Sequence, residues 1–237
     1  MIRTRRLIFL ALVLSVILAA CQPRPAARPD EQSPANARAN AAANAPANTL
    51  DPRLSLAVAP FSGASDQRQL LAGNMPQNNV IPEPDTLASL DAILQTALKP
   101  RPDRPERTIR AAGTVGSCIN FVHRGLVPTR AENLRYWQQV GQCAKTQLLL
   151  VPVVLNWKDR SGSAGGTSDP AWVVLDLNLI DVATGTVLNR FHYDYQQRPL
   201  SDNLLEVGSF VRRRGQWVSA MDLAREGIER GVRELGL

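Results

Sequence analysis

The sequence predicts an α/β (α+β) fold in which a mixed β-sheet packs with helices, preceded by an N-terminal region of different composition. The run from Gln147 to Trp157 is almost wholly apolar, which is typical of a central strand covered on both faces. Segments 172–182 and 187–195 alternate apolar and polar residues around a tight turn, which predicts a β-hairpin. Helix-capping signals precede residues 130 and 220 and predict helices there.

The first residues have the composition of a secretory signal peptide. Arg3, Arg5 and Arg6 form a positive start, and Leu7–Ala20 form an apolar run that ends in small residues. A transmembrane anchor is the alternative, but the run is shorter than the about 20 residues that a membrane-spanning helix needs. The sequence therefore predicts export.

The stretch Leu18-Ala19-Ala20-Cys21 resembles a bacterial lipobox, in which the cysteine is acylated and becomes the first residue of the mature protein. The resemblance implies lipidation, with palmitate-type acyl chains, at Cys21. Gln22 is not the aspartate that commonly retains such lipoproteins in the inner membrane. The resemblance therefore implies a lipid anchor in the outer membrane, with the domain on the periplasmic side.

Residues 21–51 are rich in Pro, Ala, Asn and Arg and nearly lack large apolar side chains. Such a segment buries too little surface to offset the entropy of ordering, which predicts a disordered tether. The tether is interpreted either as a leash that lets the domain reach away from its membrane or as a passive spacer. The predicted organisation is a signal peptide over 1–20, a lipidated tether over 21–51 and one globular domain over 52–237.

The net charge of +6 and the isoelectric point near 9.8 would suggest nucleic acid as a partner for a cytosolic protein. Three of the arginines belong to the signal peptide, and export removes the rest of the chain from nucleic acid. We therefore expect no nucleic-acid partner, and expect contact with the membrane through the lipid and with an envelope protein.

Within the domain, the pattern predicts a first strand over 54–59, closed by Pro60, and then a long polar loop over 62–84. A helix is expected over 84–98 and a short strand around Ile109. In the central strand, Pro152 cannot donate to the sheet, so we expect a bulge or an unpaired position there.

The second half of the domain is expected to begin with a loop over 158–170, followed by the hairpin. Gly185 suits the positive φ of the hairpin turn. Val187, Phe191 and Tyr193 are expected on one face of the returning strand. In the last helix, Gly227 and Gly231 are expected to allow close packing on the sheet.

These elements have the order of a known family. The tether, the early Val58-Ala59-Pro60-Phe61 strand, the strand Leu148–Leu155 and the hairpin Leu177–Val187 together resemble envelope lipoproteins with an anticodon-binding-like domain. Examples are penicillin-binding-protein activator lipoproteins, the soluble domain of the curli secretion subunit and the amino-terminal domain of the Tol-system propeller protein. The resemblance implies a periplasmic binding or regulatory module of an envelope machine.

Two cysteines remain after Cys21. Cys118 and Cys143 form an even pair in an oxidising compartment, which favours a disulfide over two buried free thiols.

A second candidate site lies near the C-terminus. Arg212, Arg213 and Arg214 stand between Phe210 and Trp217, and arginine and tryptophan are favoured at the centres of protein interfaces. The cluster is interpreted as a partner contact, and the alternative is a solvated turn whose aromatic side chains lie in the core.

No motif in the sequence indicates catalysis or a cofactor. His123 and His192 are the two histidines and lie on separate predicted elements, so a metal site is not expected. The Gly-x-Ser-x-Gly pattern of hydrolases is absent. We expect a protein that is not an enzyme, with a subunit of an oligomeric outer-membrane secretion complex and an envelope hydrolase as alternatives.

Overall fold

The computed structural model describes residues 50–100, 102, 106–122, 129–163, 166–196 and 217–237. These residues all belong to one compact unit, Ala47–Leu237. Among them, no helix is long and apolar enough to cross a membrane.

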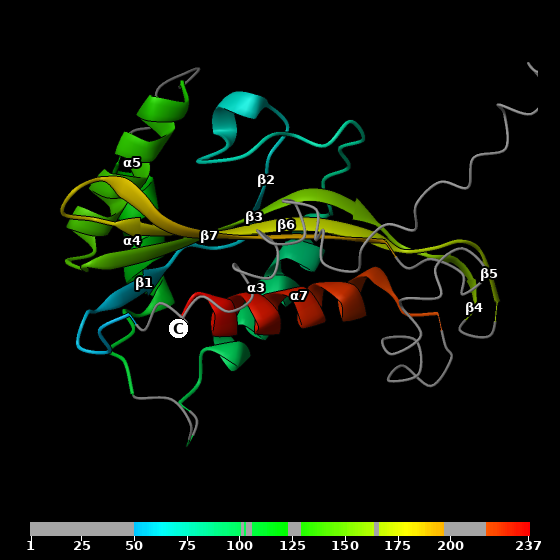
Figure 1. Ribbon diagram of the computed structural model, residues 1–237. Coiled ribbons are helices and arrows are strands. Elements are labelled where there is room, and N and C mark those ends of the chain that lie inside the picture. Colours follow the sequence, from blue (N-terminus) through cyan, green and yellow to red (C-terminus); the bar gives the residue numbers. More distant parts are fainter. Residues whose placement is uncertain (1–49, 101, 103–105, 123–128, 164–165, 197–216) are drawn as a thin grey trace, which may run out of the picture. The chain divides into compact units, whose positions relative to one another are not determined.

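A mixed sheet forms the centre of this unit (Figure 1). Its strands lie in the order β1 (Leu56–Val58), β3 (Leu148–Lys158), β6 (Trp172–Asp181) and β7 (Thr186–Gln196). β1 runs parallel to β3, and the other two pairs are antiparallel. A fifth strand, β2 (Ser62–Gly63), pairs in parallel with β3 on the same side as β1, opposite Val153 and Val154. This confirms the predicted mixed sheet and the predicted hairpin, whose turn places Gly185 at φ 66°.

Pro152 lies where the neighbouring edge of the sheet is interrupted. On β3, Leu148 N–H donates to Ser55 O, and Leu150 O accepts from Ala59 N–H, so alternate residues of β3 face β1. Pro152 is the next residue in this series, and β1 has ended before it while β2 begins only opposite Val153. The N–H that Pro152 lacks therefore falls at the gap between β1 and β2. The bulge lies elsewhere, between Val154 and Asn156.

Helices cover both faces of the sheet. One face carries α3 (Pro84–Ala97) and α7 (Ala220–Glu234), which lie beneath the sheet in Figure 1. We call the apolar cluster on this face the α3/α7 core. The other face carries α4 (Ala112–Phe121), α5 (Arg130–Cys143) and the short 3-10 helix η2 (Gln67–Gln69), which enclose the α4/α5 core.

β3 contributes to both cores because its successive side chains alternate between the two faces. Leu148 and Leu150 belong to the α3/α7 core, while Leu149 and Val151 belong to the α4/α5 core. This confirms that the apolar run is a central strand buried on both sides.

The predicted capping signals start the helices. Thr129 accepts from Glu132 N–H at 3.2 Å, while Glu132 accepts from Thr129 N–H at 2.6 Å, at the start of α5. Ser219 and Asp222 form the same reciprocal pair at the start of α7. Gly227 and Gly231 confirm the predicted close approach, since a Cβ at either position would lie under 3.0 Å from side chains of the sheet.

Four expectations were wrong. Helix α4 lies where no helix was predicted, and the expected strand around Ile109 is a single bridge to Leu56. The expected loop after β3 contains a two-stranded hairpin, β4 (Ser161–Ser163) with β5 (Gly166–Asp169). A register shift in β7 places Val187 against the α4/α5 core, on the opposite face from Phe191 and Tyr193.

Candidate functional site

Most of the predicted site residues lie outside the described part of the chain. These are Cys21, Phe210 and the arginines at 212–214, so lipidation and the arginine contact stay predictions. Trp217 is described and half-buried, and its backbone carbonyl accepts a hydrogen bond from Arg160 Nη1.

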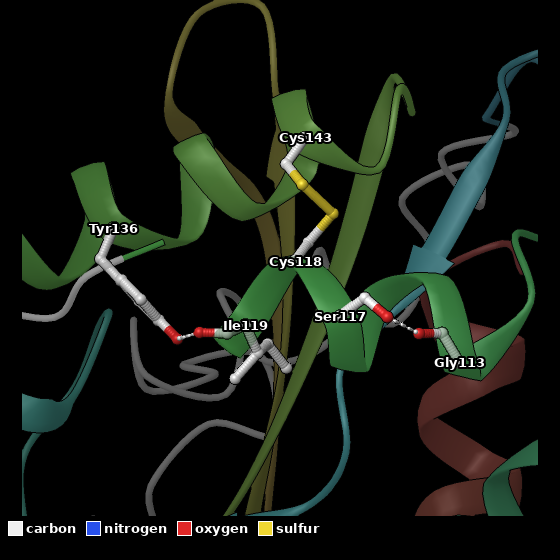
Figure 2. The surroundings of a disulfide bond; sticks show 6 residues. All are labelled: Gly113, Ser117, Cys118, Ile119, Tyr136 and Cys143. Carbon is white, nitrogen blue, oxygen red and sulfur yellow. Dashed lines mark hydrogen bonds between the residues drawn. A yellow bond between two sulfur atoms is a disulfide. The ribbon is translucent and has the colours of Figure 1, made fainter. Parts of the chain in front are cut away.

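Cys118 and Cys143 are joined in a disulfide that ties α4 to α5, with their Cα atoms 5.7 Å apart (Figure 2). A second link lies close by, because Tyr136 Oη donates to the backbone oxygen of Ile119 at 3.5 Å. The disulfide therefore has a local mechanical role: it holds α4, a helix whose N-terminus has no side-chain cap, against the rest of the domain.

α4 forms one wall of a cavity of about 420 Å³ at the β1 edge of the sheet. β1 is only three residues long and forms a short edge of the sheet. α3 lies on one face of the sheet at this edge and α4 lies on the other. We call this space the Asp91 cavity. It is lined by Val58, Ala59 and Pro60 after β1, by Asp91, Leu94, Gln95 and Leu98 on and after α3, and by Ile109, Arg110, Ala112 and Gly116.

The walls of the Asp91 cavity are mostly apolar. Leu94 and Leu98 belong to the α3/α7 core, and Ile109 remains 41% exposed at the edge. Ala112 and Gly116 stand one helical turn apart and so present small side chains on the same side of α4. A cavity of this size with apolar walls and few polar groups is the usual form of a ligand site, for which volumes of about 300–1,000 Å³ are common.

Asp91 supplies the negative charge of the cavity. Its Oδ1 accepts from the backbone N–H of Phe61 at 2.7 Å, and no ion pair joins its carboxylate to any other described residue. Burial raises the pKa of Asp91, and the Phe61 hydrogen bond offsets part of that rise. The site thus holds a partly desolvated carboxylate with one oxygen still available.

Arg110 is the cation at the rim of the cavity, and it is engaged elsewhere. Its Nε and Nη2 donate to the backbone oxygen of Lys145 at 3.2 and 2.7 Å. This anchors the guanidinium toward the α5–β3 connection. Arg110 therefore leaves the free oxygen of Asp91 without a counter-charge among the residues that the structure describes.

A second polar cluster lies on the β6–β7 hairpin. Asp176, whose side chain is 2% exposed, accepts from Arg190 Nε at 3.0 Å and lies 2.7 Å from His192 Nδ1. Arg190 and His192 therefore both contact a buried carboxylate of the neighbouring strand. His192 pairs across the strand with Asp176, and Asp194 instead accepts from Trp172 Nε1 at 2.8 Å.

This cluster can orient and neutralise charge, but its described contacts include no hydroxyl or thiol that could act as a nucleophile. Within the described ranges, no group of three or more His, Cys, Asp or Glu side chains could hold a metal ion. The cluster is accounted for as a buried ion pair that fixes the hairpin.

Sequence reasoning did not find Asp91 or Asp176. Asp91 has an ordinary helical position in the sequence, and its partner Phe61 is 30 residues away. Asp176 meets His192 because the β6–β7 register places the two residues opposite each other. The one available signal for this pairing in the sequence was the alternation of apolar and polar residues in β6.

No protein-family model matches the chain, and no curated protein matches it. Several solved structures do match the chain. The chain is similar in structure to PelC, lipoprotein GNA1162 and LpoB. The PelC dodecamer from Paraburkholderia phytofirmans matches with 13% identity and a TM-score of 0.42, covering 80% of this chain and 92% of PelC.

Lipoprotein GNA1162 from Neisseria meningitidis matches with 15% identity and a TM-score of 0.35, covering 68% of this chain and 94% of that one. The C-terminal domain of LpoB from Salmonella enterica matches with 12% identity and a TM-score of 0.34, covering 64% and 88%. The resemblance to lipoproteins that the sequence predicted is confirmed as structural similarity. At these identities and scores it assigns no role.

Proposed function

We propose that this chain is a non-catalytic lipoprotein of the outer membrane, held by acyl chains on Cys21, whose domain binds or regulates an envelope machine in the periplasm. Cell-wall synthesis and secretion or surface assembly are the candidate pathways. The observation that carries the location is the sequence Leu18-Ala19-Ala20-Cys21 after an apolar run that begins with arginines.

The described domain supports binding rather than catalysis. Its one hydrogen-bonded His–carboxylate pair, His192 with Asp176, is tied into an ion pair with Arg190. The Asp91 cavity, in contrast, is open to a ligand and holds an unpaired carboxylate between apolar walls. A disulfide that fixes one wall of this cavity favours a preformed site.

Replacing Cys21 by serine tests the anchor. One buried CH₂ contributes about 0.8 kcal/mol and a single acyl chain holds a protein only reversibly, so stable membrane attachment needs more than one chain on Cys21. We expect the Cys21→Ser variant to stay unprocessed or to leave the outer-membrane fraction.

The matched control is Gln22→Asp, which keeps the cysteine and should move the protein to the inner-membrane fraction. An unchanged membrane distribution of Cys21→Ser, or an intact precursor found in the cytosol, would contradict the proposed anchor. The size of the detergent-extracted protein, measured by light scattering, separates a single binding module from a subunit of a large ring.

A further inference from the structure

The Asp91 carboxylate sits in a setting that selects the charge of a ligand. A half-buried carboxylate without a counter-ion is costly, because apolar walls replace the water that would solvate it. The Phe61 N–H satisfies Oδ1 at 2.7 Å, and no contact described for the chain satisfies Oδ2 with a cation. A cationic group entering the cavity would complete this site.

The shape of the free acceptor distinguishes between cations. A guanidinium binds a carboxylate best when both oxygens are free to accept its two parallel N–H groups. Phe61 N–H already uses one acceptor direction of Oδ1, so the compact point charge of an ammonium group on Oδ2 fits Asp91 better than a guanidinium fork across both oxygens. The leucines at 94 and 98 and the isoleucine at 109 offer apolar surface to the methylene chain that would carry it.

We propose that the Asp91 cavity binds a lysine side chain of a protein partner, with its ammonium group on Asp91 and its methylene chain against the apolar walls. This rests on the proposed function, which makes the domain a docking module for another envelope protein. Gln95, exposed at the rim, offers an amide that can hydrogen-bond to the backbone of the inserted segment.

The first test measures the chemistry with n-butylammonium as the probe, using the full chain in a neutral detergent with ¹³C-labelled methyl groups. We expect saturable shifts of the Ile109 and Leu94 methyl signals and none of Ile228, which is buried in the α3/α7 core and does not line the cavity. n-Butanol and butanoate, which have the same length, should bind at least tenfold more weakly.

The variant Asp91→Asn separates ligand binding from a structural role. The asparagine keeps an oxygen acceptor for Phe61 N–H and removes the charge, so the domain should fold while the affinity for n-butylammonium falls at least tenfold. Equal binding of n-butanol, or unchanged binding by Asp91→Asn, would overturn the proposal. Asp91→Glu keeps the charge, so it should still bind n-butylammonium more tightly than n-butanol, and equal binding of the two by this variant would also overturn the proposal.

The second test addresses the source of the ammonium group. A photo-crosslinking residue at position 95, placed in the chain in intact cells, should capture a lysine-bearing segment of a partner, and Asp91→Asn should abolish that adduct. An adduct that is insensitive to Asp91→Asn contradicts a lysine on Asp91. Since n-butylammonium binding needs no membrane anchor, a failure of the anchor and a failure of the cavity give different results.

Discussion

Replacing Gly231 by alanine measures how closely α7 packs on the sheet. A Cβ at this position would lie 2.5 Å from Leu177 Cδ1 and 2.5 Å from Phe191 Cδ1, whereas ordinary contacts begin at 3.4 Å. The neighbours must move by roughly 1 Å. Both are buried in the α3/α7 core, so we expect an overpacking cost of about 1–3 kcal/mol.

The intrinsic helix preference opposes this cost, since alanine is better than glycine inside a helix by about 1 kcal/mol. Gly116→Ala in α4 is the matched control, because a Cβ there would meet nothing within 4 Å. The control should gain up to about 1 kcal/mol. Subtracting the two variants cancels the helix preference and leaves the packing cost of about 1–3 kcal/mol.

The assay is urea unfolding of each variant, followed by tryptophan fluorescence at constant pH, with the free energy of unfolding taken from the linear extrapolation. Similar m-values in both variants would show that the unfolded states are comparable. If Gly231→Ala and Gly116→Ala change the free energy of unfolding by the same amount, the close approach of α7 to the sheet is not as described.

Three further predictions concern the disulfide, Asp91 and the arginine cluster. Replacing Cys118 and Cys143 together by alanine opens a loop with a sequence separation of 25, and should lower the free energy of unfolding by about 3.5 kcal/mol in the chain-entropy model. A loss below about 1 kcal/mol in urea unfolding would refute that account. Because burial raises the pKa of Asp91, the wild type should lose stability relative to Asp91→Asn as pH rises from below 3.8 through the raised pKa. Thermal unfolding from pH 3 to 7 checks this, and a wild type that gains stability relative to Asp91→Asn as the pH rises would refute it. Replacing the three arginines at 212–214 by serine should weaken capture of the partner in pull-downs while circular dichroism stays unchanged, and undiminished capture rejects the contact.

The central sheet was predictable because its signals are local and strong. β3 carries a nearly unbroken apolar run, β6 alternates apolar and polar residues, and the capping boxes at Thr129 and Ser219 mark helix starts within a single turn. A bulge or an unpaired position was expected at Pro152; the bulge lies further along β3, and on the β1 side Pro152 lies at the gap between β1 and β2.

α4 escaped prediction because its sequence opposes a helix. Gly113, Thr114 and Gly116 are weak helix formers, and no side chain caps its start. Tertiary contacts hold it instead: Val115 and Cys118 are buried against α5. A helix that is stabilised mainly by tertiary contacts cannot be predicted from the helix propensity of its own residues.

The candidate site escaped prediction for a related reason. Asp91 and Phe61 meet only once α3 packs beside the end of β1, and the exit from β1 sets the direction of the Phe61 N–H. The residues that line the cavity lie far apart along the chain, so the sequence does not show that they come together.

The disulfide between α4 and α5 also makes the structure around the Asp91 cavity depend on the redox state of the compartment. In a reducing compartment, where the two thiols stay apart, α4 would be held by the burial of Val115 and Cys118 and by the Tyr136 hydrogen bond, without the covalent link. For the exported protein that we propose, the disulfide would form only in an oxidising compartment, and the wall that α4 gives the Asp91 cavity would be fixed there.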